Sequence, residues 1–144
     1  MAVTAVLALD FAFDGLLYVT GRDLVPSFQS DLYQSAKDAG WLAGLTFAII
    51  VVAPIGEEVV FRGFLYRGLA LPGREMLAIA FIALVWTLLH IQYDVVGMIQ
   101  VFAIGLMFGW FRWASGSTAL TITMHVLINL EAMIETAIKV ELVS

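Results

Sequence analysis

Five long apolar stretches dominate this chain of 144 residues. They cover residues 1–20, 41–61, 75–92, 95–113 and 118–138. Each approaches the roughly 20 residues that an α-helix needs to cross about 30 Å of hydrocarbon. Composition agrees, since 62% of the residues are hydrophobic and only 13% are charged, whereas about a quarter are charged in soluble domains. The sequence therefore predicts an all-α, polytopic transmembrane bundle of about five spanning helices, folded as one domain over residues 1–144.

The first apolar stretch is expected to be a spanning helix rather than a cleavable signal. It lacks a basic start, and it carries Asp10 and Asp14 inside its apolar body. The polar segment 21–40 follows, and its apolar side chains recur every four residues: Leu24, Phe28, Leu32 and Ala36. This spacing predicts one amphipathic helix in the membrane interface, and a connecting helix packed on the loops fits equally well.

Composition also excludes two classes of site. The chain has no cysteine, so it has neither disulfides nor thiolate metal ligands. Its formal net charge is -5, and it lacks the clustered Lys and Arg that binding to nucleic acid requires. Nucleic acid is therefore excluded as a partner, while membrane lipid is an expected one.

Six polar residues lie in or beside the apolar stretches: Glu57, Glu58, Arg62, His90, His125 and Asn129. An ionisable side chain at the bilayer centre costs about 2.5–3.5 kcal/mol on insertion scales, so such residues normally face the protein interior and mark function. A helical rise of about 1.5 Å per residue places Glu58 and His90 within roughly one turn of each other in depth. On the same estimate, His125 needs tilt or a shifted helix boundary to join them.

The two adjacent glutamates differ in their expected partners. Glu58 and Arg62 are four residues apart, so they share a helix face and are expected to form an ion pair. Glu57 points about 100° away from that face and lacks such a partner, which makes it the better candidate for a general base. The alternative is that both glutamates are structural and pair with Arg62 and another helix.

The two histidines occur in different surroundings. His90 ends the segment "FIALVWTLLH", in which Trp86 lies one turn earlier, and a histidine near a helix end is often a hydrogen-bonded structural residue. His125 and Asn129 are four residues apart, so imidazole and carboxamide point into the same space. Such a pair can serve chemistry, and it can equally link two helices by hydrogen bonds.

Three motifs in this order resemble the CPBP family, which contains type II CAAX prenyl proteases and bacteriocin-processing or immunity proteins. "EEVVFR" (57–62) matches EExxxR, "HVLIN" (125–129) matches HxxxN, and "WTLLH" (86–90) matches FxxxH with Trp86 in place of Phe. The indole is larger than a phenyl ring and brings an N–H that needs a partner. The motif core covers residues 54–129, and three ordered motifs are far more specific than any one of them.

The resemblance implies an intramembrane endopeptidase of the glutamate type, in a prokaryotic cytoplasmic membrane, that hydrolyses a peptide bond with an activated water. Its substrate would be a hydrophobic or lipidated peptide, either a tail with a prenylated cysteine or a bacterial peptide. Carried over by residue, the water-activating pair is Glu57 and His90, the oxyanion-stabilising pair is His125 and Asn129, and the pair that holds the motif helix is Glu58 and Arg62. This division agrees with what amide hydrolysis needs, a base beside a water and donors where negative charge develops.

The family has also been described as metal-dependent, and a zinc scheme would use the same side chains differently. Glu57, His90 and His125 would coordinate the ion, and the remaining glutamate would act as the base. The scheme without a cofactor is favoured, and zinc remains the alternative.

Two other functions compete with the protease. One is a non-catalytic membrane subunit of a larger complex, since family members usually carry additional N-terminal spans and "GLMFG" (105–109) is a GxxxG surface for another helix, although internal packing is its commoner use. The other is a proton or ion conduit, which predicts charged residues at stepped depths rather than in a cluster. The remaining acids are expected to face water, a cavity or basic partner residues: Asp10, Asp14, Glu131 and Glu135.

Overall fold

The chain folds into helices joined by short connections. The computed structural model describes residues 1–143, and no β-strand occurs in that range. Five elements are regular helices: α1 Ala2–Val19, α2 Ser27–Asp38, α6 Glu75–Leu88, α7 Val95–Ser115 and α8 Thr118–Ile138. α8 continues into a wider π-helical turn, η3 Lys139–Val143. The second long helix changes its winding along its length: α3 Leu42–Phe47, η1 Ala48–Val52, α4 Ala53–Glu58, η2 Val59–Leu65 and α5 Tyr66–Leu69. The all-α class is confirmed.

Three helices are long and apolar enough to cross a membrane, namely α1, the continuous helix 42–69 and α7. α6 is apolar but has only 14 residues. α8 has 21 residues but carries polar side chains along its length, among them His125, Asn129 and Glu131. Full-length spans are thus fewer than the five expected from the apolar stretches, because α6 ends at Leu88 and polar residues interrupt α8. The chain is an integral membrane protein of helical type.

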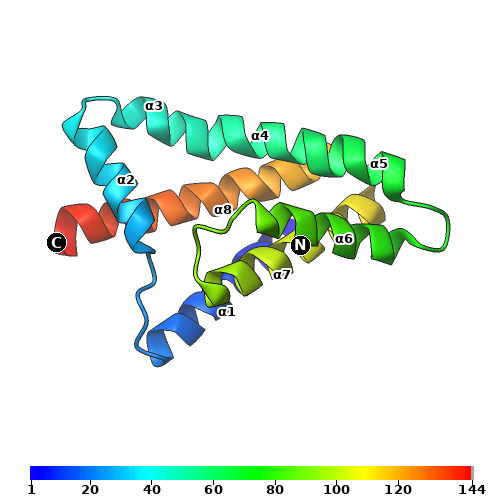
Figure 1. Ribbon diagram of the computed structural model, residues 1–144, viewed down its shortest axis with the longest axis horizontal. Coiled ribbons are helices and arrows are strands. Elements are labelled where there is room, and N and C mark those ends of the chain that lie inside the picture. The colour runs from blue at the N-terminus through cyan, green and yellow to red at the C-terminus, as the bar shows by residue number, and fades with distance from the viewer. Residues whose placement is uncertain (144) are drawn as a thin grey trace.

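The helix 42–69 and α8 run beside each other along the long axis, with α2 across one end (Figure 1). α1 packs against both α7 and α8, and the short α6 packs most extensively against α7. The chain therefore brings its third motif, on α8, against its first motif, on the helix 42–69. The second motif lies at the end of α6 and in the turn that follows, and α6 packs against α7.

The amphipathic segment forms a helix as expected, but with a different buried face. Tyr33 and Ala36 are the buried residues of α2, while Leu24 before the helix and Leu32 within it are exposed. In the last turn of α2, Nζ of Lys37 donates to both carboxylate oxygens of Glu141, at 2.7 Å to Oε1 and 2.6 Å to Oε2. The apolar stripe predicted from the spacing of four is therefore only partly the packing face.

Glycines set the close approach of α6 and α7. A Cβ on Gly105 would lie 3.1 Å from the side chains of Ala83 and Trp86, and one on Gly109 would lie 2.5 Å from Cγ2 of Ile79. The GxxxG surface is therefore covered by this chain's own helix. The feature that favoured a docking subunit is used for internal packing.

A single cluster of buried apolar side chains surrounds the motif residues. It draws on α1, η2 and the helices α5 to α8, and its members are Val6, Phe61, Tyr66, Ile79, Ile82, Trp86, Val101, Ile104, Phe108, Met124 and Ile128. Three of the six polar motif residues are buried in this region, namely Glu58, Arg62 and His125, while Glu57, His90 and Asn129 are half-buried. An unpaired polar group is costly there, yet Oε2 of Glu58 and Nε of Arg62 are buried without a hydrogen-bond partner within residues 1–143.

Candidate active site

Glu58, Arg62 and His125 form a buried polar triad. Arg62 donates from Nη1 to Oε1 of Glu58 at 2.9 Å, and the same oxygen lies 3.1 Å from Nδ1 of His125. Glu58 is 0% exposed and Arg62 is 1% exposed. The expected ion pair is therefore present, and α8 adds His125 to it. Because Glu58 is enclosed, its carboxylate holds helices together and has no open path to a substrate.

Further contacts fix the Arg62 guanidinium and main chain. Its Nη2 donates to the carbonyl of Gly105 at 3.2 Å. The guanidinium carbon lies 4.7 Å from the ring centre of Trp86 and 5.2 Å from that of Phe108, distances at which a cation is attracted by the ring. Arg112 of α7 donates from Nε to the carbonyl of Arg62 at 3.0 Å. Arg62 thus binds the first motif to α6 and α7, while Glu58 binds it to α8.

Glu57 has different surroundings from its neighbour. It is half-buried, and its Oε2 accepts the indole N–H of Trp86 at 2.6 Å. Its other oxygen, Oε1, accepts no hydrogen bond within residues 1–143. The residue that reasoning from sequence identified as the better base therefore has one oxygen held and one oxygen available.

His90 lies in the turn after α6 rather than inside a helix. Its amide donates to the carbonyl of Thr87 at 2.8 Å, and its Nδ1 lies 2.9 Å from the carbonyl of Trp86. A carbonyl can only accept, so Nδ1 carries the proton and Nε2 is the free nitrogen of the neutral ring. The rings of His90 and Trp86 meet edge to face with centres 4.8 Å apart.

Asn129 bonds a main-chain carbonyl that has lost its helical donor to a proline. Its amide nitrogen donates to the carbonyl of Ile49 in η1 at 2.8 Å. In a π-helical turn this carbonyl would receive the N–H five residues later, but Pro54 has none. Asn129 fills that position from α8. Both polar residues of the third motif thus make contacts that link helices, and their role toward an oxyanion stays a prediction.

A cavity of about 550 Å³ opens beside this group. The third motif and α6 supply one part of its wall: Trp86, His90, His125 and Asn129. α1, α7 and α8 supply an acidic part: Asp10, Asp14, Glu131 and Glu135. The prediction that these acids face a cavity is confirmed. Glu57 is not part of the wall, but it is hydrogen-bonded to Trp86, which is.

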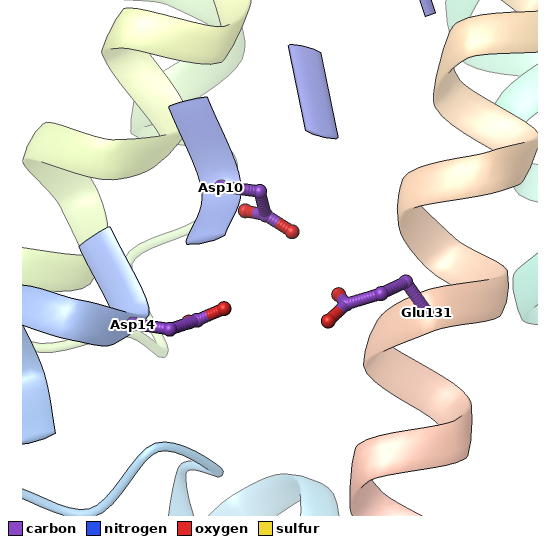
Figure 2. A group of neighbouring side chains, drawn as sticks. All are labelled: Asp10, Asp14 and Glu131. Atoms are coloured by element: carbon purple, nitrogen blue, oxygen red, sulfur yellow. The ribbon is translucent and has the colours of Figure 1, made fainter. Parts of the chain in front are cut away.

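The acidic part of the wall gathers carboxylates from two helices. Figure 2 shows Asp10 and Asp14 of α1 turned toward Glu131 of α8, and one ligand atom of each lies within 4.8 Å of the others. Gln100 of α7 donates to Asp10 at 2.7 Å. Among residues 1–143 this is the one group with spacing suited to a cation. Within it, Oδ2 of Asp14 is buried and has no hydrogen-bond partner within residues 1–143.

The zinc scheme does not fit the arrangement of its three residues. Glu57, His90 and His125 are not among the described groups whose ligand atoms come together as a metal would require. We therefore derive no chemical step through a metal ion.

Reasoning from sequence gave Trp86 no role in the site. Trp86 contacts Glu57, His90, Arg62 and His125, the last with ring centres 5.5 Å apart, and it is only 3% exposed. The signal was the indole N–H, which a buried tryptophan must satisfy and which phenylalanine lacks.

Comparison with known proteins identifies the motif region. Residues 39–130 match the family model described as type II CAAX prenyl endopeptidase, Rce1-like. No curated protein and no solved structure matches the chain. The match covers the helix 42–69, α6, α7 and most of α8, and so includes all six motif residues.

Proposed function

Because this chain belongs to the Rce1-like family of type II CAAX prenyl endopeptidases, we propose that it is an intramembrane endopeptidase whose attacking water is activated by Glu57 and His90. The observation that carries the proposal is the placement of both side chains against one residue, Trp86. Oε1 of Glu57 and Nε2 of His90 are the atoms left without protein partners. A carboxylate and an imidazole in such positions are suited to take a proton from water.

The proposed reaction is a proton-balanced hydrolysis. Water loses a proton to the Glu57–His90 pair as its oxygen bonds to the scissile carbonyl carbon, and a tetrahedral oxyanion forms. Asn129 has a second amide hydrogen to offer that oxyanion, and His125 can donate from Nε2 when its ring carries both protons. The C–N bond then breaks as the proton passes to the leaving amine.

The substrate is proposed from the family and from the site's place in the membrane. A CAAX-type peptide carries a prenyl group, which is as apolar as the lipid around this bundle. Exposed apolar side chains occur along the spanning helices, and such surfaces suit contact with lipid and with a lipidated peptide. We propose a prenylated or otherwise hydrophobic peptide as the substrate class.

The experiment compares the chain with its Glu57→Gln variant, purified in mild detergent with any partner chains retained. Quenched peptides with and without a farnesylated cysteine serve as substrates, each assayed with and without chelator. Glu57→Gln is expected to lower turnover at least about a hundredfold, because it removes a general base. Glu75→Gln is the matched control, since Glu75 is the first residue of α6, does not line the cavity and accepts a hydrogen bond from the Gly73 amide.

The outcomes separate the proposed function from its rivals. Cleavage that survives chelation and disappears in Glu57→Gln supports the glutamate scheme. Loss of cleavage in chelator contradicts it and favours metal dependence. A chain that copurifies in a stoichiometric complex and cleaves neither peptide is instead a structural subunit.

A further inference from the structure

We propose that Trp86 is a positioning residue, whose indole N–H fixes the Glu57 carboxylate and whose carbonyl fixes the ring of His90. The inference rests on the proposed function, because it concerns the two groups that would activate water. It assigns a role to a side chain that replaces the phenylalanine of the matching motif. Three observations on different atoms of Trp86 support it.

The first observation is the contact between the indole and the carboxylate. Nε1 of Trp86 donates to Oε2 of Glu57 at 2.6 Å, across two elements 29 residues apart in the chain. Hydrogen bonds to ionised acceptors are short and are stronger than neutral ones. The bond occupies Oε2 and leaves Oε1 without a hydrogen bond within residues 1–143. Trp86 thereby selects which oxygen of Glu57 can meet a substrate water.

The second observation concerns the main chain of the same residue. The carbonyl of Trp86 lies 2.9 Å from Nδ1 of His90, so it must accept a proton from that nitrogen. The neutral imidazole is then left with Nε2 free. Since His90 lines the cavity, Nε2 is the nitrogen available there. One residue thus sets both the oxygen and the nitrogen that the proposed reaction would use.

The third observation is that Trp86 itself cannot readily move. It is 3% exposed, and its ring contacts the rings of His90, Phe108 and His125 at centre distances of 4.8, 6.0 and 5.5 Å. The guanidinium of Arg62 lies 4.7 Å from the ring centre. A donor held this firmly lowers the freedom of the acceptor that it binds. Rigid support of this kind is what keeps a reacting group in productive geometry.

The decisive variant is Trp86→Phe, which keeps an aromatic ring and removes the N–H. Turnover number is expected to fall about tenfold, as for loss of one hydrogen bond to a charged group, while KM changes less than about twofold. Trp110→Phe is the matched control, because Trp110 lies on α7 at 47% exposure and takes no part in the site. That control should keep both constants.

A second measurement detects the hydrogen bond between Trp86 and Glu57 directly and does not depend on turnover. The chain has four tryptophans, so an ¹⁵N-labelled sample in micelles gives four indole N–H signals, which single Trp→Phe variants assign. The Trp86 signal is expected downfield and slow to exchange with solvent, and Glu57→Ala should move it upfield. Glu75→Ala should leave it in place.

The two measurements together decide the inference. A Trp86 signal that ignores Glu57→Ala overturns it, and so does a Trp86→Phe variant that keeps the turnover number of the unaltered chain. If the unaltered chain cleaves nothing, the proposed function fails, while the Trp86 signal still decides whether the indole positions Glu57. A moved signal with reduced turnover number and unchanged KM supports both.

Discussion

Gly109→Ala tests the close packing of α6 on α7. The added Cβ would lie 2.5 Å from Cγ2 of Ile79 and 3.2 Å from its Cβ and Cγ1. Ile79 is 4% exposed and branched at Cβ, so the clashing methyl cannot swing aside as the end of a long side chain would. Overpacking of this kind costs about 1–3 kcal/mol, and alanine regains about 0.5–1 kcal/mol of helix propensity. We expect a net loss of about 1–2 kcal/mol.

The assay is reversible unfolding by SDS in mixed micelles, followed by circular dichroism. Gly44→Ala is the control, because a Cβ there meets nothing within 4 Å, and it should be neutral or slightly stabilising. Ile79→Leu moves the branch away from Cβ and should recover much of the loss in the double variant. The reasoning is refuted if Gly109→Ala is as stable as Gly44→Ala, or if its effect depends on protein concentration, as a contact between chains would require.

Three further predictions concern other parts of the bundle. Arg62→Met leaves Glu58 buried without its counter-charge, and we expect a loss of about 3–5 kcal/mol in the same unfolding assay, against little change if the pair were solvated. Asn129→Ala removes the donor to the carbonyl of Ile49 and should lower the free energy of unfolding by about 1–3 kcal/mol, with faster amide exchange in η1 as the local readout. The hydrogen bond from Lys37 lowers the pKa of Glu141 below its ordinary 4.5, and the same bond raises the pKa of Lys37 above 10.5. The protection of α2 that this pair provides should therefore persist between these values and weaken as pH falls through the lowered pKa of Glu141, and amide exchange of Glu141→Gln should show no such dependence.

Local patterns predicted part of the site correctly. The i, i+4 spacing of Glu58 and Arg62 predicted their ion pair, since both partners lie on one helix. The apolar stretches likewise predicted the helices, although α6 ends before His90 and places it in a turn. Helix ends depend on capping and on contacts with other elements, which hydropathy does not report.

Sequence patterns did not predict which residues meet when they lie far apart in the chain. His125 was expected to need tilt or a shifted helix boundary to join Glu58, and the structure brings the two within 3.1 Å. The indole of Trp86 and the amide of Asn129 were each known to need a partner, but spacing along the chain does not identify one on another helix. The meeting of Asp10 and Asp14 with Glu131 is of the same kind.

Some polar side chains inside the bundle have their partner on the same helix, and others have it on a helix that is synthesised much later. This difference affects how each helix enters the membrane. Glu58 meets its counter-charge four residues later in the same helix, whereas Asp10 is bonded by Gln100, which is synthesised 90 residues afterwards. A nascent chain can therefore pass the first pair into the bilayer as one neutral unit. The carboxyl groups of α1 meet these partners only after α7 and α8 have emerged from the ribosome, so α1 becomes fully accommodated in the bilayer only after both helices have been made.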